Sequence, residues 1–167
     1  ATNNSFIQYN GNQGTINATN TVTGATTWLN IGAGRSPSVN EGFFRGDIAE
    51  IITYDQALPV ADRQKIASYM AIKYGLTLNH DYVNSAGTKL WDIAANGGTA
   101  AGNFNNNIFG IGREDCQSLH QRQSVSANSR TELLTIGNKS IIGTANAATN
   151  NNNITNDNTF LLLGDNN

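Results

Sequence analysis

The chain has 167 residues, enough to bury a hydrophobic core, and 60 of them are Asn (26), Thr (17) or Gly (17). Charged residues make up 13% of the chain and the formal net charge is −2, which excludes the basic surface of a nucleic-acid-binding protein. Two histidines and one cysteine exclude a three-histidine zinc site and an internal disulfide, and no apolar run is long enough to span a membrane.

Short strands joined by turns are expected in the first third of the chain, because Thr favours strands while Asn and Gly favour turns. The alternation of polar and apolar residues predicts strands over 5–9, 15–23, 26–31 and 42–54, with a loop over 33–41. The last of these strands is the strongest. Its sequence, GFFRGDIAEIITY, places apolar side chains on both faces, which is typical of a central strand covered on both sides.

One helix is expected from 60 to 74. Pro59 suits the start of a helix, where its missing N–H leaves no hydrogen bond unmade, and Gly75 suits the left-handed residue that ends one. Ile66 and Met70 lie four residues apart within an apolar stripe. We therefore expect a single amphipathic helix that buries these two side chains against a β-layer.

Beyond a domain boundary near Gly75, the chain is again expected to be β-structure. Predicted strands cover 89–93, 107–111, 132–136 and 159–163, and the Asn- and Thr-rich tract 144–159 is expected to form a loop because it has little to bury. In the segments 29–32, 109–112 and 134–137 a glycine directly follows an isoleucine. This pattern predicts strands that stop at that glycine.

The stretch from Trp28 to Gly75 resembles the closing segment of laminin-G/concanavalin-A-like sandwich domains. The residues that match the pattern of these domains are Phe44, Gly46, Asp47, Ile48, Glu50, Tyr54 and Leu58. Residues 76–167, with LWDIAANGG, NNIFGIGRED, LHQRQSVS and FLLLGDNN, are similar to an uncharacterised conserved region that follows such a sandwich in large secreted bacterial surface proteins.

The resemblance implies a mainly β fold in three parts. Residues 1–57 would supply the closing strands of a partial jelly-roll-like (laminin-G/concanavalin-A-like) β-sandwich, residues 58–75 the helix, and residues 76–167 a second, truncated β-rich segment. A full sandwich needs more strands than precede the helix. We therefore expect the chain to be a fragment whose open edges need neighbouring domains of the same chain, or a partner chain, to cover them.

Two carboxylates in the strand predicted over 42–54 invite comparison with retaining glycosidases on the sandwich fold, which carry E-x-D-x-x-E on one strand. Asp47 and Glu50 match the second and third positions of that motif, but Arg45 replaces its first Glu. These enzymes need one carboxylate as nucleophile and another as acid, so the nucleophile is missing. Arg45 to Asp47 also read RGD, the tripeptide that integrins bind, but chance alone often produces it and we expect no integrin binding.

Other catalytic patterns are incomplete. Tyr69 and Lys73 have the spacing of the catalytic pair of short-chain dehydrogenases, but the nucleotide-binding G-x-G-x-x-G after a strand is missing. His80 and Asp81 match half of a metal-dependent hydrolase motif, and the chain lacks its further histidines. These four residues therefore predict no catalytic site.

Glu114, Ser118 and His120 can be drawn as a catalytic triad, but the sequence around them has neither a nucleophile elbow nor an oxyanion hole. Cys116 lacks the cationic neighbour that activates a reactive thiol. We therefore expect no enzyme activity, no catalytic residue and no organic cofactor.

Calcium is the one cofactor that the sequence leaves open, because Ca²⁺ binds carboxylate, amide and carbonyl oxygens, and laminin-G-like domains often hold one. Candidate oxygens come from Asp165 with Asn166, or from Asp92 with the cluster Asn103–Asn107. No twelve-residue EF-hand spacing is present, so the metal ligands stay unknown.

These observations favour a non-catalytic module of a large secreted or cell-surface bacterial protein, acting in adhesion or in glycan or protein binding. A chain with so few ionisable residues has little capacity for acid–base catalysis. We expect an extracellular location. Two alternatives stay open: an accessory carbohydrate-binding module of an exported polysaccharide-degrading enzyme, and a structural spacer or secretion-substrate fragment.

Overall fold

The structure is a computed structural model that describes residues 8–9, 12–13, 31–35, 40–96, 103–126, 134–138 and 152–166. The chain divides into two compact units, one made of residues 1–5 and 16–57 and the other of residues 6–15 and 58–167. The strand predicted over 15–23 and most of the strand predicted over 26–31 lie outside the described residues.

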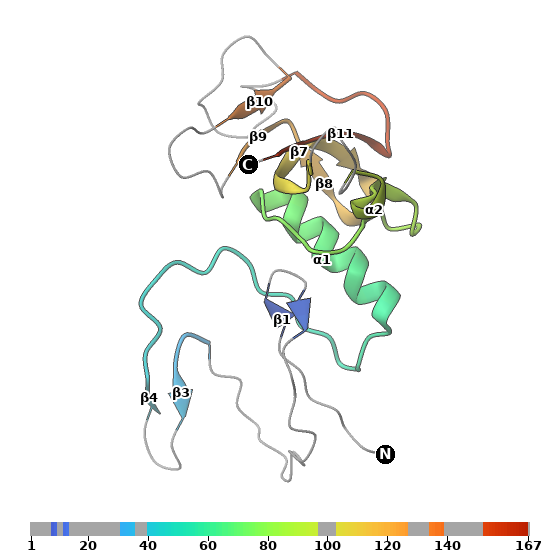
Figure 1. The fold of residues 1–167 in the computed structure, drawn as a ribbon. Coiled ribbons are helices and arrows are strands. Elements are labelled where there is room, and N and C mark those ends of the chain that lie inside the picture. The colour runs from blue at the N-terminus through green and yellow to red at the C-terminus, as the bar shows by residue number, and fades with distance from the viewer. Residues whose placement is uncertain are drawn as a thin grey trace. The chain divides into compact units, whose positions relative to one another are not determined.

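The described residues form a mainly β fold with one main helix, as the sequence predicts (Figure 1). The helical elements are α1 (Val60–Tyr74), the single-turn α2 (Ile93–Asn96) and the 3-10 turn η1 (Asp115–Gln117). The strands are β1 (Gln8–Tyr9), β2 (Asn12–Gln13), β3 (Gly34–Arg35), β4 (Asn40–Glu41), β5 (Tyr82–Val83), β6 (Lys89–Trp91), β7 (Asn106–Glu114), β8 (Leu119–Gln121), β9 (Gln123–Val125), β10 (Thr135–Gly137) and β11 (Thr159–Asp165).

The described strands pair in small sheets. β11, β7 and β8 form one three-stranded sheet, with β7 in the centre. The others pair two by two: β1 with β2, β3 with β4, β5 with β6 and β9 with β10. These strands alone form no jelly roll, so the jelly-roll-like sandwich stays a prediction.

In the first unit, β3 and β4 form a short antiparallel hairpin within the segment 33–41 that the sequence predicts as a loop. The backbone N–H of Phe44 donates a hydrogen bond to the carbonyl of Gly32 (2.8 Å) just beyond the hairpin. This hydrogen bond extends the contact between the two sides of the hairpin to Phe44.

The strand predicted over 42–54 is wrong. Residues 43–59 contain neither helix nor strand, and Phe43 and Tyr54 are 68% and 52% exposed. A segment with apolar side chains on both faces becomes a strand only where other strands pair its backbone and other layers cover both faces. No described strand pairs with this segment, which explains why its apolar pattern does not produce the expected strand.

The helix prediction is confirmed, since α1 begins at Val60 and ends at Tyr74. Pro59 occupies the N-cap position with φ −56° and ψ 156°. Gly75 ends the helix in the left-handed conformation (φ 65°), and its N–H donates to the carbonyl of Ala71. A residue with a side chain would be strained there, so the glycine marks the end of the helix for a steric reason.

The packed face of α1 differs from the predicted stripe. Ser68, Ala71 and Ile72 are buried, whereas Ile66 and Met70 are only half-buried. The hydroxyl of Ser68 can be buried because it accepts a hydrogen bond from the backbone of β5 (3.0 Å) and donates one within the helix (2.8 Å). Small side chains let the strands approach the helix closely, which a count of large apolar residues does not reveal.

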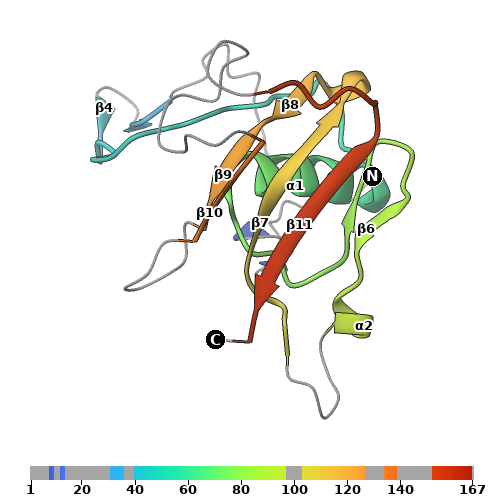
Figure 2. The same cartoon turned by 90° about the horizontal axis from the view of Figure 1, so that it is seen from above.

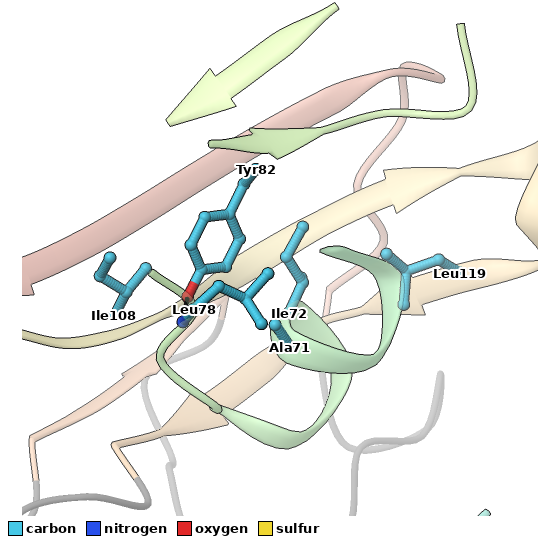
Figure 3. Packing of buried hydrophobic residues seen from close by; sticks show 6 residues of the cluster. All are labelled: Ala71, Ile72, Leu78, Tyr82, Ile108 and Leu119. Carbon is cyan, nitrogen blue, oxygen red and sulfur yellow. Dashed lines mark hydrogen bonds between the residues drawn. The ribbon is translucent and has the colours of Figure 1, made fainter. Parts of the chain in front are cut away.

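α1 packs against one face of the three-stranded sheet, with β7 and β11 crossing over it (Figure 2). The buried cluster between helix and strands is small and apolar. It consists of Ala71, Ile72, Leu78, Tyr82, Ile108 and Leu119 (Figure 3). Phe160 and Leu162 of β11 are partly buried against it.

β7 continues past Gly112, the glycine at which the sequence predicts its end. It extends to Glu114, three residues beyond the predicted bound at Ile111. A Cβ on Gly112 would lie 2.8 Å from Cε1 of Phe160, inside van der Waals contact. The glycine therefore serves the close approach of β11 within the sheet and does not end the strand.

Tyr82 of β5 fills the turn that follows α1 and is fully buried. Its hydroxyl donates to the carbonyl of Leu76 (2.8 Å) and accepts a hydrogen bond from the backbone N–H of Leu78 (3.0 Å). Burial raises the pKa of Tyr82 above its ordinary value, so the side chain stays neutral. One side chain thus satisfies two backbone groups of the turn, and Figure 3 shows the Tyr82 hydroxyl beside Leu78.

Candidate functional site

The residues compared with glycosidases lie in the segment without regular structure. Arg45 and Asp47 are exposed and Glu50 is half-buried. No strand forms here, and even on a strand Asp47 and Glu50, three residues apart, would face opposite sides. The structure therefore does not assemble the paired carboxylates that glycoside hydrolysis needs.

The Tyr69–Lys73 pair lies on the last turns of α1. The ammonium of Lys73 donates to the Tyr69 hydroxyl (2.6 Å) and sits 5.0 Å from the Tyr69 ring centre and 5.5 Å from that of Tyr74. A cation beside aromatic rings is a favourable structural contact. The pair therefore stabilises the helix end, and no nucleotide-binding loop accompanies it in the described residues.

The three triad candidates do not converge. In the register of β7 and β8, Glu114 lies opposite Leu119, and Arg113 lies opposite His120. Neighbouring residues on a strand face opposite sides, so Glu114 and His120 project from opposite faces of the sheet. The carboxylate of Glu114 is buried and accepts a backbone hydrogen bond from the loop after β5 (2.7 Å), while Ser118 is exposed.

Asp81, Lys89 and Asp92 form a compact charged cluster on the β5–β6 hairpin. The ammonium of Lys89 lies 2.8 Å from a carboxylate oxygen of Asp81 and 2.8 Å from one of Asp92. Its hydrogen bonds hold the pKa of both carboxyls below the ordinary value and raise the pKa of Lys89. The His80 ring contacts the backbone carbonyl of Asp81 (3.0 Å), so the His80–Asp81 pair is part of a structural cluster.

The same cluster positions the segment around α2. Asp92 accepts hydrogen bonds from the N–H groups of Ala94 and Ala95 (3.0 Å each), which satisfies the first turn of α2. The indole N–H of Trp91 donates to the amide oxygen of Asn105 (2.8 Å). These polar side chains therefore stabilise the fold locally.

Several of the side-chain oxygens considered for calcium accept hydrogen bonds from N–H groups. This holds for Asp92 and Asn105, and Asp165 accepts from the side-chain amide of Asn107 (2.7 Å). Within the described residues, no group of three or more His, Cys, Asp or Glu side chains is arranged to hold a metal ion. The structure therefore assigns no ligand set, and calcium binding stays a prediction.

A second polar cluster, which the sequence analysis missed, fixes the loop 152–158 that leads into β11. The guanidinium of Arg113 binds both carboxylate oxygens of Asp115 (2.7 and 2.9 Å). It also donates to the backbone carbonyls of Ile154 (3.1 Å) and Thr155 (3.0 Å). Asp157 of the loop in turn accepts the backbone N–H of Asp115 (2.8 Å).

His120 and Arg122 complete this cluster. His120 accepts the backbone N–H of Ile154 at Nε2 (3.2 Å), and its Nδ1 lies 2.9 Å from a guanidinium nitrogen of Arg122. Arg122 also donates to the side-chain oxygen of Asn153 (3.2 Å). Desolvation, and then the charges of Arg122 and Arg113, lower the pKa of His120. We call Arg113, Asp115, His120 and Arg122 the loop anchor.

The loop anchor leaves only a faint signal in the sequence. Arg113 and Asp115 are two residues apart, as are His120 and Arg122, so each pair shares one face of an extended chain. The groups that they bind are backbone atoms of a loop about 30 to 40 positions further along the chain. Nearly every residue has the same backbone N–H and carbonyl groups, so nothing in the sequence identifies which loop residues Arg113 and His120 bind.

Residues 62–167 match the family described as "Domain of unknown function (DUF8202)". The chain belongs to this family. No curated protein and no solved structure matches the chain. Among the described residues, no helix has the length and apolar character needed to cross a membrane. The resemblance of residues 28–75 to laminin-G-like sandwiches stays a prediction.

Both polar clusters lie within the DUF8202 domain. In each, carboxylates meet cations or backbone N–H groups, and the second cluster joins segments that are distant in sequence. Charged groups held in this way orient loops. Cys116 is exposed at η1. Both clusters therefore stabilise the fold of this domain.

Proposed function

We propose that the chain is a non-catalytic interaction module of a large secreted or cell-surface bacterial protein, which binds a glycan or another protein outside the cell. The observation that carries this proposal is a run of exposed apolar side chains in the segment 43–54. These are Phe43 (68% exposed), Phe44 (58%), Ile48 (47%), Ile51 (47%), Ile52 (39%) and Tyr54 (52%).

Six large apolar side chains within twelve residues are unusual on a protein surface. Single exposed apolar residues are normal, but a contiguous group of them marks an interaction site. Aromatic residues such as Phe43 and Phe44 are enriched where proteins contact their partners. The segment 43–54 therefore supports binding as the activity of this chain.

The polar clusters support the non-catalytic part of the proposal. Asp81 and Asp92 are held by Lys89, and Asp115 by Arg113, so these carboxylates neutralise nearby cations. General acid–base catalysis needs a titratable group in reach of a substrate, with a pKa near the working pH. The lowered pKa values of the three carboxyls move them away from that range.

The alternative of an accessory carbohydrate-binding module draws support from the same segment. The rings of Phe43, Phe44 and Tyr54 are all more than half exposed. Each ring offers a flat apolar surface on which the C–H-rich face of a sugar can stack. A glycan as ligand would favour this alternative, and a protein as ligand would favour an adhesin.

Binding is tested by passing the purified chain over an array of bacterial and plant polysaccharides and over a panel of purified extracellular-matrix proteins. The variant Phe43→Ser/Phe44→Ser removes the two most exposed rings of the segment. Val60→Ser, which removes a 70% exposed apolar side chain outside the segment, is the matched control. We expect a bound glycan or protein whose affinity falls by about tenfold or more in the double variant, as for two interface anchors, and is unchanged in the control.

Three outcomes contradict the proposal. Binding to neither panel would leave the chain a structural spacer. Equal loss of affinity in Val60→Ser and in the double variant would show that the segment is not the contact surface. Release of soluble sugar from a bound polysaccharide would make the chain an enzyme.

A further inference from the structure

We propose that His120 is an acid-sensitive latch that holds the loop 152–158 on the sheet at neutral pH and releases its Ile154 end when the imidazole is protonated. The proposal concerns the loop anchor of the DUF8202 domain. It is independent of the binding activity proposed for residues 43–54.

The geometry around the imidazole favours the neutral ring. Nε2 faces the backbone N–H of Ile154 (3.2 Å) and Nδ1 faces the guanidinium of Arg122 (2.9 Å). A neutral imidazole accepts a hydrogen bond at one nitrogen, so the latch is the tautomer with its proton on Nδ1, which leaves Nε2 to accept the Ile154 N–H. A protonated imidazole carries N–H at both nitrogens, so a donor at Nε2 then faces the N–H donor of Ile154.

The charges that face the ring also oppose protonation. Arg113 lies directly opposite His120 on β7, and Arg122 follows β8. Among the described residues, Asp115 of η1 is the acid whose charge acts on the ring, and Asp157 of the loop lies next to Asp115. Asp115 is already bound by the Arg113 guanidinium, and Asp157 accepts the backbone N–H of Asp115. A protonated ring would thus join two guanidinium groups, while one acid is already neutralised and the other already hydrogen-bonded.

The pKa agrees with this geometry. Desolvation, followed by Arg122 and Arg113, lowers the pKa of His120 below its ordinary value of 6.5. A lowered pKa means that the released state binds the proton more tightly than the latched state does. The latch is therefore fully effective above pH 6.5 and is lost as the pH falls through the lower pKa of the latched ring.

Only part of the loop depends on the latch. The carbonyls of Ile154 and Thr155 stay bound to Arg113, whose guanidinium does not titrate in this range. Within the described part of the chain, His120 is the acceptor for the Ile154 N–H, so this N–H loses its acceptor when the ring is protonated. We therefore expect a local opening at residues 152–154, next to Asn153 and its contact with Arg122.

Amide hydrogen exchange of the full chain, measured by NMR between pH 7.5 and 5 and corrected for the intrinsic pH dependence of exchange, tests the latch. We expect the protection of the Ile154 amide to fall several-fold over this range in the parent. In His120→Gln, whose amide oxygen accepts a hydrogen bond but does not titrate, protection should not change with pH. His80→Gln, which removes the other histidine, should behave as the parent does.

Two results would overturn the latch. One is Ile154 protection that is independent of pH in the parent, and the other is an equal loss in parent and His120→Gln. If His120→Gln does not fold, the NMR titration of the His120 ring in the parent decides. A ring pKa at or above 6.5 contradicts the latch, and a lower value that coincides with the loss of Ile154 protection supports it.

Discussion

Alanine at Gly112 should destabilise the three-stranded sheet through a single side chain, that of Phe160. A Cβ at position 112 would lie 2.8 Å from Cε1 and 3.0 Å from Cγ of the Phe160 ring. The ring would have to leave its place against the core. At Gly110 the obstacle is the backbone of β11, where a Cβ would meet the carbonyl oxygen of Leu161 and lie 2.9 Å from Cα of Leu162.

Alanine at the two glycines should therefore differ in the stability that it removes and in whether Phe160→Ala restores that stability. Overpacking costs about 1–3 kcal/mol, and alanine recovers about 0.5 kcal/mol through the lower entropy of the unfolded chain. For Gly112→Ala we expect a net loss of about 1.5 kcal/mol in the free energy of unfolding, or about 6 °C in Tm. Gly110→Ala should cost about 3 kcal/mol, because a hydrogen-bonded strand backbone cannot move away from the new Cβ, whereas a side-chain ring can rotate. In a Phe160→Ala background, Gly112→Ala should cost nothing further, whereas Gly110→Ala keeps its full cost.

Urea unfolding followed by circular dichroism measures these costs for the parent, the single variants and the two double variants. The coupling between positions 112 and 160 is the decisive quantity. If Gly112→Ala costs the same with and without the ring, Phe160 does not exclude a side chain at that position. If removal of the ring also rescues Gly110→Ala, the alignment of β7 with β11 is wrong.

Three further predictions concern single side chains of the same domain. Tyr82→Phe leaves the buried N–H of Leu78 and the partly buried carbonyl of Leu76 without their partner, and it should cost about 3 kcal/mol in thermal unfolding. Tyr54→Phe, which removes the hydroxyl of an exposed residue, should change stability by less than about 0.5 kcal/mol. Equal effects of the two would contradict the role of the buried hydroxyl. Lys89→Gln should raise the pKa of Asp81 in an NMR titration. In the parent, this carboxyl contributes stability above pH 3.8 that is lost as the pH falls through its lowered pKa, and the variant should lose part of that contribution. An unchanged titration would exclude Lys89 as the cause of the lowered Asp81 pKa. Ile72→Asp places an unpaired charge in the core and should abolish cooperative unfolding, with a cost of about 4 kcal/mol or more; a variant that melts like the parent would show that this helix face is not packed.

Local signals in the sequence determined the helix. The proline before it and the glycine after it act on the backbone at their own positions, and α1 begins directly after Pro59 and ends directly before Gly75. The mainly β character of the rest also follows from composition, because Thr, Asn and Gly express their preferences residue by residue.

Tertiary structure decided which residues of the helix are buried. Sequence hydrophobicity favours Ile66 and Met70, but the strands pack on Ser68 and Ala71. The burial of Ser68 is possible because a strand from elsewhere in the chain supplies a hydrogen-bond partner. Whether such a partner exists depends on the fold, and no local pattern contains it.

The segment 42–54 shows the converse case, in which the sequence predicts a strand that tertiary structure does not form. Its alternation has the pattern of a buried strand, yet a strand also requires neighbours that pair its backbone and cover its faces. The loop anchor is a further case, since Arg113 and His120 bind backbone atoms that any residue would present. The sequence by itself thus determined the elements whose stability is local. The sheet register, the buried helix face and the fixed loop were decided only by tertiary structure, because each depends on groups that meet through long-range contacts.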